Sequence, residues 1–165
     1  MPTPASPPTP LESLRQARVV LCSACLLGFD CRYDALDKRA PHVLEALAGK
    51  EVVPVCPEVA GGLSVPRTPA DLAGGTGGAV LDGTARVATR EGRDVTAAFA
   101  QGATLALAAA RRYGAGVAVL KEGSPSCGTH RVMVDGASVA GRGVAAAALE
   151  RAGVALLSDE DLEQP

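Results

Sequence analysis

Short apolar runs alternate with amphipathic segments along most of this chain. Three runs rich in valine or alanine predict buried parallel strands, at residues 17–21, 51–55 and 116–120. Helical periodicity predicts four helices, at residues 11–16, 41–49, 94–113 and 144–152, and a last apolar run predicts a closing strand at 154–157. Because strands that alternate with helices are typical of layered α/β proteins, we expect an α/β fold. It would be a single layered domain with a mostly parallel, Rossmann-like sheet flanked by helices.

The segments between these elements are less regular. Two Asp-Gly pairs, Asp82-Gly83 and Asp135-Gly136, predict hairpins at residues 80–87 and 131–140. Residues 59–78 are rich in glycine and proline, and they predict a long irregular excursion. This excursion is either a floppy connection or a lid over a substrate.

Both ends of the chain have a biased composition. Residues 1–10 are rich in proline and predict a disordered tail, so that the domain is expected to cover residues 11–165. Residues 158–165 are acidic and predict a solvated tail.

Composition narrows the class of protein further. The net charge of −2 gives no basic groove, so no long nucleic acid is expected as a partner. The sequence has no apolar run of about 18 residues, which a membrane span would need. Its first residues also lack the basic region and the apolar core of a secretory signal. We therefore expect a cytoplasmic protein. In that compartment thiols stay reduced, so the five cysteines point to burial, catalysis or metal binding rather than to a disulfide framework.

The cysteines are placed unusually. Each of the three predicted parallel strands runs into a cysteine: the first into Cys22 and Cys25, the second into Cys56, the third into the loop that carries Cys127. In open parallel sheets, ligands bind outside the carboxyl ends of the strands. If these strands are neighbours, three thiols meet at one point and can hold zinc or an iron–sulfur cluster. This argument leaves open whether Cys22 or Cys25 contributes the first thiol.

Two polar residues lie close to these thiols in the sequence. Glu58 follows Cys56 by two residues, and Ser124 precedes Cys127 by three. A carboxylate near a metal can move protons, and a hydroxyl can bind a substrate or relay a proton. Taken singly, Glu58 is as readily a surface charge and Ser124 a turn cap. The two histidines, His42 and His130, have no ligand spacing and are expected at the surface.

Several blocks together make a more specific pattern. The chain resembles the thiouracil desulfidase family, a bacterial and archaeal group long catalogued as a domain of unknown function. The resemblance covers roughly residues 18–158. It rests on these motifs: Ser23-Ala24-Cys25-Leu26-Leu27-Gly28, Arg32-Tyr33-Asp34, Val55-Cys56-Pro57-Glu58, Gly61-Gly62-Leu63, Pro66-Arg67, Gly92-Arg93-Asp94-Val95-Thr96, Leu120-Lys121-Glu122 and Ser124-Pro125-Ser126-Cys127-Gly128.

The resemblance implies a [4Fe-4S] cluster held by Cys25, Cys56 and Cys127. It also implies a fourth iron without a protein ligand, which binds the sulfur of a thiolated uracil. The reaction turns C=S into C=O without net redox and releases hydrogen sulfide, with Glu58 and Ser124 as the acid–base pair. The implied substrate is a small thiolated pyrimidine base, nucleoside or nucleotide.

This chain also departs from the family pattern. Ala35 stands where many members have glycine, and Gly123 stands where a larger polar residue is common. Cys22 and Cys31 lie outside the implied ligand set, and Cys31 is the nearest candidate for a spare ligand. Two other hypotheses stay open on the residues alone. One is a zinc-stabilised binding module without catalysis, and the other is a thiol oxidoreductase that uses Cys22 and Cys25.

Overall fold

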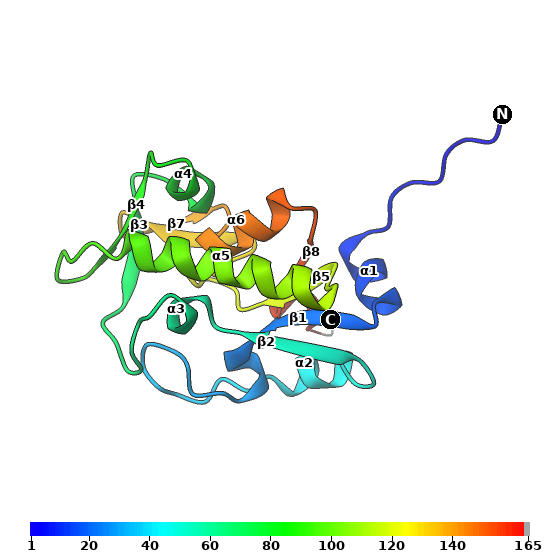
Figure 1. Cartoon of the computed structure of the whole chain (residues 1–165), viewed down its shortest axis with the longest axis horizontal. Helices are drawn as coiled ribbons and strands as arrows, with labels where there is room; N and C mark the ends of the chain where they lie inside the picture. Colours follow the sequence, from blue (N-terminus) through cyan, green and yellow to red (C-terminus); the bar gives the residue numbers. More distant parts are fainter. Residues whose placement is uncertain (164–165) are drawn as a thin grey trace.

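The computed structural model describes residues 1–163 and contains two four-stranded sheets (Figure 1). The first sheet has the strand order β2-β1-β5-β8, and all its neighbouring strands are parallel. Its strands are β1 (Val19–Ser23), β2 (Glu51–Val55), β5 (Val117–Leu120) and β8 (Ala155–Ser158). These are the four strands that the apolar runs predict. The expected α/β class, with a mostly parallel sheet flanked by helices, is confirmed.

Helices cover both faces of this sheet because side chains alternate along each strand. In β1, Val19 and Leu21 face the core that α5 (Thr96–Tyr113) and α6 (Val144–Arg151) complete. The intervening Val20 and Cys22 face the opposite core, which α1 (Pro10–Gln16) and α2 (Pro41–Ala46) cover. All four predicted helices are therefore present, and α2 ends earlier than expected. None of the helices in residues 1–163 has the length and apolar character that crossing a membrane requires.

The second sheet is only partly as predicted. Its order is β4-β3-β6-β7, with strands β3 (Ala70–Ala73), β4 (Arg86–Thr89), β6 (Arg131–Val134) and β7 (Ala137–Ala140). The hairpin at Asp135-Gly136 is confirmed as β6 and β7. The hairpin at Asp82-Gly83 is wrong, because Val80 and Leu81 end a short helix, α4 (Gly77–Leu81). A short apolar run does not separate strand from helix, and the true partner of β4 is β3.

The excursion at 59–78 is less irregular than expected. It contains the end of α3 (Pro57–Ala60), all of β3 and the start of α4. Two glycines hold it close to the long helix: a Cβ atom on Gly102 of α5 would lie 1.9 Å from the carbonyl oxygen of Pro57, and one on Gly61 would lie 2.0 Å from that of Ala98. Because only glycine allows this approach, α3 is pressed against α5, and the residues around Cys56 are fixed in place.

The two tails behave differently from one another. Residues 1–9 are exposed and have no regular structure, and Thr9 caps the start of α1 at Pro10. The disorder predicted for the first ten residues stays a prediction, although the helix already includes Pro10. The acidic end is not a solvated tail: it forms the short helix η2 (Glu160–Leu162), and Asp159 is buried. The predicted tail also includes residues 164–165, which lie outside the described part of the chain.

Candidate active site

Three cysteines line one cavity because their strands are neighbours. Cys25 lies in η1 (Ala24–Leu27) directly after β1, Cys56 directly precedes α3 at the end of β2, and Cys127 lies in the loop after β5. Since β1 lies between β2 and β5 and the three strands are parallel, their carboxyl ends lie at the same edge of the sheet. The cavity there has a volume of about 360 Å³, and Glu58 and Ser124 also line it. It lies at the switch point of the sheet, where ligands of open α/β folds bind.

The structure separates the other two cysteines. Cys22 is fully buried in the apolar core under α1 and α2 and does not line the cavity. An exposed redox pair of Cys22 and Cys25 is therefore not formed, and Cys25 is the thiol that the first strand supplies to the cavity. Cys31 is half-buried and does line it. The thiol of Cys56 donates to the Cys31 carbonyl oxygen at 3.6 Å.

The surroundings of Cys56 and Cys127 favour the protonated thiol. Burial raises the pKa of Cys127 to about 12, against the opposing effect of a hydrogen bond from Ser23. The hydrogen bond with Cys31, followed by burial, raises the pKa of Cys56 well above its ordinary value. Binding of a metal cation favours ionisation of such a buried thiol, because the thiolate is the form that ligates the metal. In residues 1–163 no three His, Cys, Asp or Glu side chains form a compact site for a single metal ion.

Glu58 is fixed by two partners inside the cavity wall. Arg67 Nε donates to one carboxylate oxygen at 3.2 Å, and Ser126 Oγ donates to the other at 3.4 Å. The ion pair is largely shielded from water, with 8% of the Arg67 side chain and 16% of the Glu58 side chain exposed. A charge-assisted bond at such a site orients the carboxylate and balances its charge. Glu58 is therefore not a free surface charge.

Ser124 has a defined hydrogen-bonding direction. Its Oγ accepts the backbone N–H groups of Ser126 and Cys127, both at 3.1 Å. A hydroxyl has two acceptor positions and one proton, so both acceptor positions are taken by the loop that carries Cys127. The remaining proton is available to a ligand in the cavity. Ser124 thus both caps the turn, as its simpler interpretation predicts, and presents a donor at the site.

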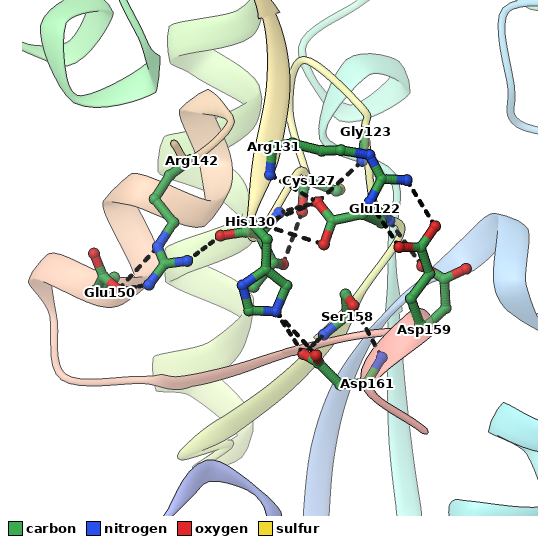
Figure 2. A network of polar contacts seen from close by, with 12 residues as sticks. Glu122, Gly123, Cys127, His130, Arg131, Arg142, Glu150, Ser158, Asp159 and Asp161 are labelled. Atoms are coloured by element: carbon green, nitrogen blue, oxygen red, sulfur yellow. Dashed lines mark hydrogen bonds and ion pairs between the residues drawn. The ribbon is translucent and has the colours of Figure 1, made fainter. Parts of the chain in front are cut away.

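A buried carboxylate, Glu122, closes the base of this loop (Figure 2). Its oxygens accept four backbone N–H groups at 2.9–3.2 Å, from Gly123, Thr129, His130 and Arg131. Burial alone would raise the pKa of Glu122, but these hydrogen bonds outweigh burial and hold the pKa below its usual value. The residues on both sides of Ser124 and Cys127 are therefore tied to one side chain.

The acidic end of the chain holds the same loop from behind. Asp159 accepts the Glu122 N–H at 2.8 Å and pairs with Lys121, while Asp161 accepts from His130 Nε2 at 2.9 Å. Figure 2 shows these carboxylates converging on the loop from the strand end of β8. His130 is exposed, as expected, whereas His42 is half-buried and contacts the Asp159 carbonyl oxygen at 2.8 Å.

Sequence patterns predict no role for Arg67, Glu122 or Asp159. Arg67 and Glu122 stand inside the quoted motifs Pro66-Arg67 and Leu120-Lys121-Glu122, so their position in a motif was the available signal. Asp159 had no such signal, because an acidic residue near a chain end is usually solvated.

Comparison with known proteins agrees with this arrangement. The sequence model of the 2-thiouracil desulfurase family matches residues 20–161, a segment that includes every cavity residue discussed above. The chain belongs to this family. This match confirms the family resemblance that the sequence motifs predict. The roles of Cys25, Cys56, Cys127, Glu58 and Ser124 stay predictions.

Two relatives cover most of the chain. YbbK of Bacillus subtilis (strain 168), an uncharacterized protein, is 40% identical over 147 residues, which are 87% of this chain and 97% of YbbK. The solved structure of TudS, a [4Fe-4S]-dependent thiouracil desulfidase, is 42% identical and has a TM-score of 0.75. That match covers 88% of this chain and 93% of the TudS chain. The folds of the family member and of this chain are thus alike over nearly their whole lengths.

Proposed function

We propose that this protein is a [4Fe-4S]-dependent thiouracil desulfidase. It replaces the C=S group of a thiolated uracil by C=O and releases hydrogen sulfide without net redox. The substrate is a small molecule, either the free base or its nucleoside or nucleotide. The observation that carries the proposal is the meeting of three thiols, Glu58 and Ser124 in one cavity at the ends of adjacent parallel strands. Free thiols suit a reducing compartment, so the proposal includes a cytoplasmic location.

The donor set fits the proposed cofactor. Thiolates are the ligands that iron–sulfur clusters use, and Cys25, Cys56 and Cys127 are free thiols that reach the cavity from three separate segments. When bound by three thiolates, the cluster supplies one iron without a protein ligand, a Lewis acid for the substrate sulfur. The protein holds these thiols with little freedom, because Cys25 and Cys127 are buried and Cys56 starts a helix pressed onto α5.

The two other residues divide the proton transfers between them. Glu58 is oriented by Arg67 and Ser126, and as a carboxylate it accepts a proton from the water that becomes the carbonyl oxygen. Ser124 has no free acceptor position, so it serves as the donor, toward the departing sulfur or the pyrimidine ring. The proposed assignment is therefore Glu58 as base and Ser124 as hydrogen-bond donor.

Iron and sulfide analysis of anaerobically purified protein tests the cofactor. We expect about four irons and four sulfides per chain, as in a cubane cluster. Cys25→Ala, Cys56→Ala and Cys127→Ala should lower this content, and Cys22→Ala is the matched control that removes a buried thiol outside the cavity. The ligand variants are also made with Cys31→Ala, because Cys31 lines the same cavity and is a thiol that could stand in for a missing one. Protein that takes up only zinc would overturn the proposal and favour the non-catalytic binding module.

Turnover tests the reaction. Iron-loaded protein incubated with 2-thiouracil should form uracil and sulfide in equal amounts, with no reductant consumed. A requirement for a stoichiometric electron donor would contradict the non-redox reaction while leaving the cofactor assignment in place.

A further inference from the structure

The motif Arg32-Tyr33-Asp34 lies beside the cavity but takes no part in ligation or proton transfer. Arg32 and Tyr33 both line the cavity. The chain has two phenylalanines and two tyrosines, and of these four residues only Tyr33 is among the described residues that line the cavity. Phe99 is buried in the core and Tyr113 ends α5. Tyr33 is therefore the aromatic residue that a planar ligand in the cavity can meet.

Two contacts to backbone oxygens attach this motif to the wall that carries the proposed base. The thiol of Cys56 donates to the carbonyl oxygen of Cys31 at 3.6 Å, and the backbone N–H of Arg67 donates to the carbonyl oxygen of Tyr33 at 2.8 Å. Arg67 also donates through Nε to Glu58 at 3.2 Å. Tyr33 is thus linked, through the single residue Arg67, to the carboxylate that accepts a proton from water in the proposed reaction.

The ring of Tyr33 is supported on one face. The guanidinium carbon of Arg32 lies over this ring at 5.5 Å from the centroid, within the range of a cation–π contact. Asp34 in turn holds Arg32, because its Oδ2 accepts from Arg32 Nη2 at 3.3 Å. The side chains of this ion pair are only 20% and 22% exposed, whereas Tyr33 is 39% exposed. A ring that is held on one face and left accessible can bind a ligand at a small cost in conformational entropy.

The other groups of the cavity recognise the edge of a ligand and not its face. Ser124 presents a hydrogen-bond donor, Glu58 presents an acceptor, and the thiols are ligands for iron. A pyrimidine also has two flat faces, and bases stack on aromatic side chains through such faces. A stacked face fixes the plane of the ring and contributes affinity that does not depend on the sulfur atom.

We propose that Tyr33 binds the pyrimidine ring of the substrate by stacking, on the face of its own ring turned away from Arg32. This inference rests on the proposed function. No covalent bond forms or breaks in this contact, so its contribution is to affinity and to selection of a flat, unsaturated ring. The motif then acts as a unit, in which Asp34 holds Arg32 and Arg32 supports the ring of Tyr33.

Calorimetry on iron-loaded protein with two oxo-pyrimidine probes tests this inference. Uracil has no sulfur, so its Kd measures recognition of the ring alone. The second probe, 5,6-dihydrouracil, keeps both carbonyl and both N–H groups but loses the flat, unsaturated ring. Wild-type protein should bind uracil more tightly than 5,6-dihydrouracil. Tyr33→Ala should weaken uracil binding by about 5–150-fold and affect 5,6-dihydrouracil much less, so that the two affinities become nearly equal.

Two further variants serve as controls. Tyr33→Phe keeps the aromatic ring and should keep the wild-type affinities. Tyr113→Ala is the matched control, because Tyr113 is exposed, has Arg112 at 5.6 Å from its ring centroid and lies outside the cavity lining; its affinities should also equal those of wild type. In steady-state kinetics, Tyr33→Ala should raise the KM for 2-thiouracil with little change in kcat, because stacking binds the substrate and the transition state alike.

The wild-type comparison of the two probes needs no variant, so it decides the question even if Tyr33→Ala loses its iron. Equal wild-type affinity for uracil and 5,6-dihydrouracil, unchanged affinities in Tyr33→Ala, or an equal loss in Tyr33→Phe would overturn the inference and leave the proposed function standing. Failure of iron-loaded wild type to form uracil and sulfide from 2-thiouracil would overturn the proposed function. A preference for uracil that disappears in Tyr33→Ala would even then support a pyrimidine-stacking site.

Discussion

Replacement of Glu122 by Gln tests whether a buried charge holds the loop of Cys127 in place. The side chain is 5% exposed and keeps its size and shape in the variant. One carboxylate oxygen, Oε1, accepts from all four N–H donors, so a glutamine oxygen in the same position preserves the geometry. The variant removes the negative charge and also replaces Oε2, which accepts from the His130 N–H at 3.2 Å, by an amide NH2 group that cannot accept.

The expected cost follows from the change in hydrogen-bond type. Bonds to a charged acceptor contribute about 1.5–3 kcal/mol each and neutral ones about 0.5–1.5, a difference of about 1 kcal/mol per donor. Since four donors share one oxygen, the contributions are not fully additive, and we expect Glu122→Gln to lower the free energy of unfolding by about 2–4 kcal/mol. This is a large part of the total of about 5–15 kcal/mol that is usual for a domain. Iron content should fall as the loop loosens.

The effect should depend on pH with a definite sign. The pKa of Glu122 is lowered in the folded state, so its contribution is complete above the unfolded pKa of about 4.3. The contribution is lost as the pH falls through the lower folded-state pKa. The difference between wild type and Glu122→Gln should therefore be largest at neutral pH and shrink in acid, where protonated Glu122 resembles glutamine.

Anaerobic urea unfolding of iron-loaded protein, followed by far-UV circular dichroism, measures this difference. Glu160→Gln is the matched control: Glu160 pairs with Arg131 beside the same loop, but both side chains are 40% or more exposed, so the expected loss is below about 1 kcal/mol. An equal loss in both variants, or a loss in Glu122→Gln that does not shrink in acid, would refute the reasoning.

Two other experiments probe the cavity wall, and a third probes the backbone at Ala35, outside the cavity lining. Glu58→Gln and Ser124→Ala should keep the iron content and slow sulfide release from 2-thiouracil by about 10²–10⁴-fold, and wild-type rates in iron-loaded variants would exclude both from the chemistry. Arg67→Gln removes a charge-assisted bond worth about 1.5–3 kcal/mol, so kcat should fall by about 10–150-fold with the cluster retained; an unchanged kcat would mean that Glu58 needs no such support. Ala35 has a φ of 55°, in the left-handed region, so Ala35→Gly should raise the free energy of unfolding by about 0.5–1 kcal/mol in urea titrations, and a loss of stability would contradict this.

The strands of the first sheet could be predicted because the local pattern of apolar residues specifies them. The central strands β1 and β5 are buried at every position, so their sequences are nearly continuous apolar runs, and the edge strands β2 and β8 carry shorter apolar runs of the same kind. The place of the cavity followed from the same runs, because the carboxyl ends of neighbouring parallel strands meet at one edge. That β1 lies between β2 and β5 was an assumption of this argument, and the structure supplies it.

The second sheet was not predictable to the same degree. Strand β3 has the sequence Ala70-Asp71-Leu72-Ala73, with a single large apolar side chain, and it pairs with β6, which lies some sixty residues further along the chain. Its stability comes from non-local pairing, and such pairing leaves almost no local pattern. The error at Asp82-Gly83 has the same origin, since Val80 is buried by α6 and not by a partner strand.

Roles that depend on charge were the hardest to predict. Glu122 and Asp159 are buried with backbone N–H groups and Lys121 as partners, and these partners come from two segments, residues 121–123 and 129–131. A sequence shows each acidic residue but not its donors, so the solvated interpretation was the natural one for residues 158–162. Burial of a carboxylate is favourable only once its hydrogen bonds are made, which is a property of the assembled fold.

The cavity has one rigid and one loosely held wall, and this difference bears on the proposed reaction. Cys127 is 4% exposed, in a loop tied by Glu122 and backed by η2, whereas Cys31 is half-buried in a segment without helix or strand. A permanent ligand belongs on the rigid wall, because a thiolate that moves would release iron. The proposed role of Cys127 as a cluster ligand thus agrees with the mechanical character of the segment that carries it.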